Sequence, residues 1–349
     1  MKQLTNTQEL LDTMLSDGRL ENYVLLVGFG DDEWELTSEK CDTDTYFDSA
    51  SVGKIFPTTA LILRLVGEGR LSLDDTIDKF FDGVPEDRRG ITVKHLLTHT
   101  SGMLRGVYPD NVAERGRESV IEFIFSLPLA YETGTHFAYC CDGMMLLGFI
   151  VEKVLGTDLE TAMKKYVLSP LDRSRSTYEI PCDKNAVNCN HLPEVTDIRR
   201  DDDNVKKLRG IPAGNGGVFI TPGDLRAFVK AVMARDERLY SREMYDASEK
   251  NLTSGLPTLD KFRGCQNHGL GYMYINENQP QACELFPEGS IGHTGWTGQS
   301  FMLCRDIGLY VILMTDATRC MAKLGRHIDE GVHEMRTLVH RAIKKDLGL

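Results

Sequence analysis

The stretch SVGKIFPTTALILRLVGEG, residues 51–69, carries the pattern around which the expected fold is organised. Its apolar positions suit a largely buried helix from Ser51 to about Glu68, which Gly67-Glu68-Gly69 ends. Pro57 should loosen or bend this helix, because its ring removes one backbone donor. Ser51 and Lys54 lie at the helix start, where the i to i+3 spacing places the lysine amine beside the serine hydroxyl.

Strands are expected on both sides of this helix, and shorter helices between them. Period-two and apolar patterns predict strands at residues 23–27, 33–36, 217–220, 271–275, 299–304 and 309–314. Helical patterns with Gly and Pro boundaries predict helices at 7–17, 93–99, 118–126, 143–155, 159–168 and 319–345. The polar stretch from Asp183 to Lys207 is expected to be a long exposed connection.

The order of these elements predicts the fold class. Strands occur near both ends of the chain while the centre is helical, so pairing the two ends into one antiparallel sheet makes the helical segment an insertion. We therefore expect an α/β (α+β) fold, with an antiparallel sheet flanked by helices. The predicted domains are 1–75 with 208–349 for the sheet, and 76–207 for the mainly helical insert, with a cleft between them.

Charge and apolar patterning restrict the partners. The chain has 349 residues with 40 Lys and Arg against 52 Asp and Glu, and this net charge of −12 disfavours nucleic acid. The longest apolar runs are far shorter than the roughly 20 residues that cross a bilayer, so no membrane span is expected. Residues 1–7 lack the apolar stretch of a secretory signal, which favours a cytoplasmic location.

Three sequence elements could carry chemistry. Ser51 needs a base to become a nucleophile, and Lys54 can supply one. Taken alone, this Ser-x-x-Lys pattern is also typical of a helix N-cap followed by a solvated lysine. Tyr139-Cys140-Cys141 precedes a predicted helix, and Gly292-His293-Thr294-Gly295 precedes the last strand pair.

In this order and at these separations, Ser51-x-x-Lys54, Tyr139-x-x and His293-Thr294-Gly295 resemble the three signature elements of the serine β-lactamase and penicillin-binding-protein superfamily, particularly its class C-like branch. The likeness extends through residues 91–102, 146–152, 216–218 and 224–225, and it covers most of residues 45–316. The resemblance implies the same architecture as the pattern of elements, because that family joins both chain ends into one domain and inserts a helical one.

The resemblance also implies roles for individual residues. Ser51 is the expected acylated nucleophile, and Lys54 with Tyr139 is the pair expected to move its proton. The backbone N–H groups of Ser51 and Trp296 are the expected oxyanion hole. The further expected site residues are His293 as the third-element group, and Thr294, Gly295 and Cys141 as substrate-binding positions.

Two departures from the family pattern bear on the substrate. Cys141 stands where the family usually has Asn, and a thiol cannot replace an amide that donates and accepts strong hydrogen bonds. His293 stands where the family often has Lys, and an imidazole is mostly neutral at pH 7. We therefore expect a small-molecule acyl substrate, an ester, small amide or D-amino-acid peptide, with weak β-lactamase activity and no cofactor. Acylation should rise with pH until the Lys54–Tyr139 pair has lost its proton.

Several alternatives remain open at the level of sequence. The chain could be a genuine β-lactamase, a D-alanyl carboxypeptidase, or a β-lactam sensor that is acylated without turnover. Cys141 with His293 as base would be a different nucleophilic pair.

The candidate metal sites are incomplete. His95 with His99, and Cys182 with Cys189 and His191, lack the further ligands of a metal site. Packing is therefore favoured for the two histidines, and surface thiols are favoured for the cysteines. A solvated helix face is favoured for His327, His333 and His340.

Overall fold

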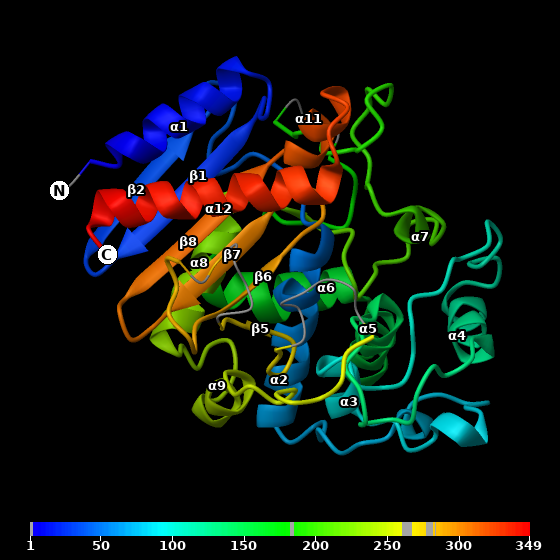
Figure 1. Ribbon diagram of the computed structural model, residues 1–349. Helices are drawn as coiled ribbons and strands as arrows, with labels where there is room; N and C mark the ends of the chain where they lie inside the picture. Colours follow the sequence, from blue (N-terminus) through cyan, green and yellow to red (C-terminus); the bar gives the residue numbers. More distant parts are fainter. Residues whose placement is uncertain (1–2, 182–184, 260–266, 277–281, 283) are drawn as a thin grey trace.

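A six-stranded antiparallel sheet forms the centre of the computed structural model, which describes residues 3–181, 185–259, 267–276, 282 and 284–349 (Figure 1). The strand order is β2-β1-β8-β7-β6-β5. In chain order the strands are β1 (Tyr23–Phe29), β2 (Asp32–Thr37), β5 (Met273–Tyr274), β6 (Ile291–Thr294), β7 (Ser300–Cys304) and β8 (Leu309–Thr315). A separate pair joins β3 (Phe47–Asp48) to β4 (Phe219–Ile220).

The pairing of β1 with β8 joins the two ends of the chain, as the sequence predicts. Tyr23 lies opposite Thr315 and Phe29 opposite Leu309. Both faces of this sheet are covered, which explains why β1 reads as a continuous apolar run rather than an alternating one. In Figure 1, α1 (Thr5–Ser16) and α12 (Ile328–Leu347) lie side by side over one face, and α8 (Pro222–Ala234) packs on the other.

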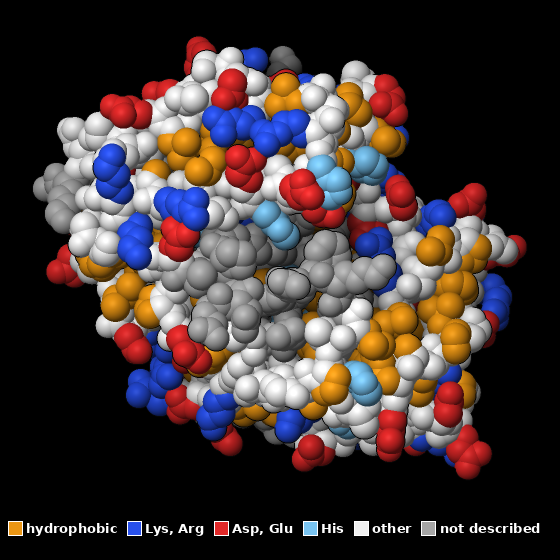
Figure 2. Space-filling view, in the orientation of Figure 1, with side chains coloured by type: hydrophobic (Ala, Val, Ile, Leu, Met, Phe, Trp, Pro, Cys, Tyr) orange, Lys and Arg blue, Asp and Glu red, His pale blue; other side chains and the backbone are white. Residues whose placement is uncertain are grey.

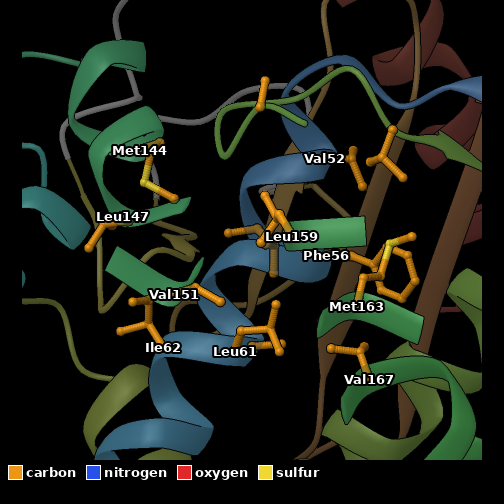
Figure 3. Close-up of a cluster of buried hydrophobic side chains, with 14 of the residues drawn as sticks. Val52, Phe56, Leu61, Ile62, Met144, Leu147, Val151, Leu159, Met163 and Val167 are labelled. Carbon is orange, nitrogen blue, oxygen red and sulfur yellow. The ribbon is translucent and has the colours of Figure 1, made fainter. Parts of the chain in front are cut away.

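Helices dominate the middle of the chain, also as predicted. They are α2 (Ala60–Gly67), α3 (Val93–Leu97), α4 (Arg117–Ser126), α5 (Cys141–Leu155), α6 (Leu159–Met163) and α7 (Asp203–Lys206). Nearer the C-terminus, α9 (Arg242–Ser248) precedes β5, and α11 (Ala317–Lys323) follows β8. Short or irregular turns occur at Ala50–Lys54, Ile55–Thr59, Ile77–Lys79, Glu86–Arg88, Lys164–Leu168 and Ser169–Leu171. Figure 3 shows α2, α5 and α6 meeting through buried side chains that include Leu61, Leu147 and Leu159. This contact fixes the start of α5 relative to the segment that precedes α2.

The prediction of one continuous helix from Ser51 to Glu68 is wrong. Residues Ala50–Lys54 form a 3-10 turn, and α2 begins only at Ala60. Between them the backbone leaves the helical region at Phe56, with φ −109° and ψ 103°, and the Phe56–Pro57 peptide bond is cis. The bend expected at Pro57 is therefore confirmed. The Ala50–Gly67 segment is long and apolar enough to count as a candidate membrane span, but 72% of it is buried inside the protein.

Two further sequence predictions need correction. The helix expected over 319–345 is two helices, α11 and α12, which meet near Gly325 at φ +64°. The connection expected to be exposed between Asp183 and Lys207 is partly buried over its described residues 185–207. Cys189, Asn190 and Asp201 are buried there. The Asp201 carboxylate accepts from the N–H of His191, and the Asp201 N–H donates to the carboxylate of Asp48. The predicted domain boundaries remain a prediction.

Candidate active site

Ser51 and Lys54 lie on the same side of the 3-10 turn that precedes α2. Lys54 Nζ donates to Ser51 Oγ at 2.9 Å and to the backbone carbonyl of Asn215 at 2.8 Å. The lysine side chain is almost completely enclosed, with 1% exposed. Burial acts to lower the pKa of Lys54, but the Cys141 and Tyr139 groups outweigh it, and the pKa is raised overall. The amine is therefore an ammonium at neutral pH, held against the hydroxyl.

Tyr139 approaches this pair from the segment that precedes α5. Its ring centroid lies 5.0 Å from Lys54 Nζ. Burial raises the pKa of the Tyr139 phenol to about 12, although the Lys54 charge and hydrogen bonds with Ser51 and Lys54 oppose this shift. The phenol is thus protonated at neutral pH. The structure thus brings Ser51, Lys54 and Tyr139 together in one group of contacts.

Three glycines allow other backbone segments to approach the serine turn closely. A Cβ on Gly53 would lie 2.9 Å from Gly216 Cα, and one on Gly216 would lie 2.7 Å from the Ala50 carbonyl oxygen. A Cβ on Gly295 would lie 2.7 Å from the Ser49 carbonyl oxygen. Since real Cβ atoms do not approach backbone atoms so closely, glycine is the residue that fits at these positions. The His-Thr-Gly element is thereby held against the turn that carries Ser51.

His293 is a buried, neutral imidazole on β6, the strand that precedes the pair β7 and β8. Its Nδ1 lies 2.8 Å from the backbone carbonyl oxygen of Thr294 and donates to it, since that oxygen can only accept. The tautomer leaves Nε2 as an acceptor, and Nε2 has no hydrogen-bond partner among the residues the structure describes. Burial, followed by the nearby charge of Lys54, lowers the pKa of His293 well below its ordinary value. No permanent cation occupies this position.

A cavity of about 570 Å³ opens onto this group and includes the remaining predicted positions. Cys141, Thr294, Gly295 and Trp296 all line it together with Ser51, Tyr139 and His293. Figure 2 shows a recess on this side of the molecule, with histidine, acidic and basic side chains along its edge. The backbone N–H of Trp296 forms no hydrogen bond with any described residue.

Sequence reasoning missed several residues of the site. The backbone carbonyl oxygen of Asn215 accepts a hydrogen bond from Lys54 Nζ. Asn215 is buried and lines the cavity. Arg336 on α12 is buried and donates to the carbonyl oxygens of Gly295 and Gln299, so it supports the His-Thr-Gly turn from behind. His268 lines the cavity as well. None of these positions carries a local pattern, although the Gly216-Gly217 pair beside Asn215 marks the close approach.

The histidines and cysteines considered for metal binding are used in other ways. His95 Nδ1 accepts from the N–H of Thr92 in a helix cap, and α3 ends at Leu97, so His99 does not share a helix face with it. His191 binds Asp201, and Cys182 lies outside the described residues. His327 and His333 are exposed as expected.

His340 departs from the solvated helix face that the sequence favours. Its side chain is buried, with the ring against Phe286 at 5.6 Å between centroids. It lies on a buried face of α12, where the 3.6-residue period of the helix places it with Arg336, Ile343 and Leu347.

One cluster of potential metal ligands occurs within the described part of the chain. Glu21, Asp316 and Cys320 have ligand atoms within 4.8 Å of one another. The Asp316 carboxylate already accepts from the side chain and backbone N–H of Asn22, and Glu21 binds Lys323. These contacts account for the cluster without an ion. The alternative nucleophile Cys141 has no hydrogen bond to His293 among the described contacts.

Comparison with known proteins assigns the family. A family model described as Beta-lactamase matches residues 9–328 of this chain. The chain belongs to the β-lactamase family. The superfamily that the three sequence elements resemble is therefore confirmed, and with it the mixed α/β fold built on an antiparallel sheet.

Relatives of this β-lactamase-family chain carry several activities in their names. It is 24% identical to an N-acetylmuramyl-L-alanine amidase of Bacillus subtilis, over 79% of this chain and 69% of that protein. It is 26% identical to a putative D-alanyl-D-alanine carboxypeptidase of Escherichia coli, over 74% of this chain and 66% of that protein. About a third of each relative's length is therefore unmatched.

Solved structures show the same fold for this family member. The octameric penicillin-binding protein homologue from Pyrococcus abyssi superposes with a TM-score of 0.70 at 22% identity, over 93% of this chain and 78% of that one. EstCE1, a hydrolase with promiscuous acyltransferase activity, superposes with a TM-score of 0.72 at 18% identity, over 94% of this chain and 98% of that one. These two structures show the fold, whereas the family model and the amidase and carboxypeptidase named above indicate a hydrolase.

Proposed function

We propose that this chain is a serine hydrolase that forms a covalent acyl-enzyme on Ser51 and acts on esters or small amides, including those of D-amino acids, with weak β-lactamase activity. The single observation that supports it most is the contact of buried Lys54 Nζ with Ser51 Oγ, where Ser51 lines the cavity. A serine becomes a nucleophile when an adjacent group takes its proton, and the buried Lys54–Tyr139 pair is placed to do so.

The proton balance of the proposed reaction follows from the protonated state of that pair. One proton must first leave Lys54 or Tyr139, because both are protonated at neutral pH. Ser51 Oγ then adds to the acyl carbon while its proton passes to the pair, and the pair returns this proton to the leaving oxygen or nitrogen. A water molecule cleaves the Ser51 ester by the same route. The N–H groups of Ser51 and Trp296 stabilise the oxyanion, each contributing about 3 kcal/mol.

We favour esters and small amides over penicillins as substrates, because the site offers no ammonium at His293 to bind the carboxylate of a penicillin. His293 is neutral, and it offers an acceptor nitrogen rather than an ammonium. Cys141 has neither the amide donor nor the acceptor that would hold a penicillin side chain. A neutral acyl donor leaves no charge unpaired in the buried site.

A second candidate is D-alanyl carboxypeptidase activity, which the named putative carboxypeptidases among the relatives favour. It requires the site to hold the terminal carboxylate of a peptide. The cavity has Arg105 and Arg336 along its wall, but Arg105 binds Asp202 and Arg336 binds backbone carbonyls. We therefore place this activity second.

The test is intact-mass analysis of the wild type and Ser51→Ala after exposure to four acyl donors: a fluorophosphonate, an aryl ester, a D-alanyl peptide and a penicillin. We expect an adduct on the wild type and none on Ser51→Ala, with fast release after the aryl ester, slower release after the D-alanyl peptide and little turnover of the penicillin. Penicillin turnover as fast as ester turnover would establish a true β-lactamase. A lasting penicillin adduct with no ester turnover would establish a sensor.

A further inference from the structure

His99 accepts hydrogen bonds from the backbone on both sides of Tyr139. Its carbonyl oxygen accepts from the N–H of Ala138 at 3.0 Å, and its Nδ1 accepts from the N–H of Cys140 at 3.2 Å. Ala138 and Cys140 are the residues directly before and after Tyr139. His99 therefore holds the backbone on both sides of Tyr139, at the Phe137–Ala138 and Tyr139–Cys140 peptide groups.

The His99 ring also packs against the Tyr139 ring. The two ring centroids are 4.6 Å apart with 44° between the planes, and His99 is almost completely buried, at 1% exposed. Burial, followed by the neighbouring His268 and the charge of Lys54, lowers the pKa of His99 well below its ordinary value. The imidazole is thus neutral, as it must be for Nδ1 to accept the hydrogen bond from Cys140.

Tyr139 needs such support because its own segment has no regular structure. Residues 138–140 are neither helix nor strand, and α5 begins only at Cys141. The helix preceding His99 likewise ends at Leu97, and His99 has a left-handed backbone with φ +56°. This conformation is uncommon for residues other than Gly, Asn and Asp, and it turns both the carbonyl and the side chain of His99 toward the Tyr139 segment.

We propose that His99 is a positioning residue that holds the Tyr139 phenol in line with Ser51 and Lys54 during acyl transfer. The proposal rests on the proposed function, in which Tyr139 carries part of the proton transfer. A displacement of about 1 Å in such a group lowers a rate by about 100-fold without preventing substrate from binding. Loss of the Cys140 contact should therefore lower kcat and leave KM nearly unchanged.

Two substitutions separate this role from a general packing role. In His99→Asn, the side-chain oxygen lies close to the position of Nδ1, and Asn tolerates the left-handed backbone. In His99→Gln, the amide is one bond further out and cannot take the same hydrogen bond. His95→Gln is the matched control, because a glutamine at the third helical position keeps the Thr92 capping box.

The measurements are steady-state hydrolysis of an aryl ester and the rate of fluorophosphonate labelling at Ser51, on variants with unfolding temperatures checked first. We expect His99→Asn within about 5-fold of wild-type kcat, and His99→Gln lowered about 30-fold or more with KM within about 3-fold. His95→Gln should match the wild type. Equal rates for the Asn and Gln variants, or a loss confined to KM, would overturn the role of His99. If Ser51→Ala still hydrolyses the ester, the proposed function itself fails.

Discussion

Lys54 Nζ and Ser51 Oγ lie 2.9 Å apart in a turn that admits almost no solvent to the lysine. A buried ammonium costs free energy unless its donors are used, and here the serine oxygen and the Asn215 carbonyl oxygen accept two of its three hydrogens. The contact therefore both stabilises the charge and places a potential base beside the hydroxyl.

Replacing Lys54 by methionine should remove the base while preserving most of the side-chain volume. We expect Lys54→Met to lower the labelling rate of Ser51 by about 100-fold to 10,000-fold, the range for loss of a general base. The measurement is the time course of fluorophosphonate adduct formation by intact mass. Lys94→Met, at an exposed position of α3, is the control. A Lys54→Met variant that labels as fast as this control would contradict the role of Lys54.

The rate of ester acylation should increase with pH. Both Lys54 and Tyr139 have raised pKa values, that of Tyr139 at about 12, so only a small fraction of molecules lacks one proton at pH 7. This fraction grows as the pH rises toward the apparent pKa of the pair, which belongs to both groups together. We expect kcat/KM for a neutral aryl ester to rise steadily from pH 6 to 9. A flat profile over this range would refute the coupling.

The Cys141→Asn variant should gain penicillin turnover relative to ester turnover. Cys141 lines the cavity at the first position of α5, where an amide could donate to and accept from a substrate amide. We expect the ratio of kcat/KM for a penicillin over that for an aryl ester to rise by about 10-fold. Cys141→Ala is the control, since it changes size without adding a hydrogen-bonding group. The same gain in both variants would show that the Cys141 side chain only obstructs the penicillin.

Gly295→Ala should uncouple the His-Thr-Gly turn from the nucleophile. The added methyl group would lie 2.7 Å from the Ser49 carbonyl oxygen, so the turn that carries Trp296 must move. We expect kcat for ester hydrolysis to fall by about 100-fold, because the oxyanion donor moves with it. Gly90→Ala is the matched control, since a Cβ there meets nothing within 4 Å. Comparable activity of the two variants would show that this close contact does not position the oxyanion donor.

Local patterns were sufficient to predict most of the elements and the proximity of two site residues, Ser51 and Lys54. The apolar runs of β1 and β8 are recognisable because a strand covered on both faces must be apolar throughout. Ser51 and Lys54 are recognisable because they meet within one turn, a distance that spacing along the chain determines. The bend at Pro57 is also predictable locally, because a proline inside a helical pattern bends or breaks the helix. The prediction of a single helix over 319–345 is wrong because the chain leaves the helical conformation at Gly325, and a glycine inside a helical pattern can also end a helix.

The surroundings of those residues depend on contacts between distant parts of the chain. Lys54 binds the carbonyl oxygen of Asn215, 161 positions away, and His99 reaches Cys140 across 41 positions. Arg336 joins the site only because α12 packs across the sheet behind Gly295. A backbone carbonyl looks the same at every residue, so no sequence pattern marks the one that accepts from a buried lysine. The sequence therefore determines which reactive side chains the site contains. The hydrogen-bond partner of each side chain is determined only when the helices and the sheet pack together.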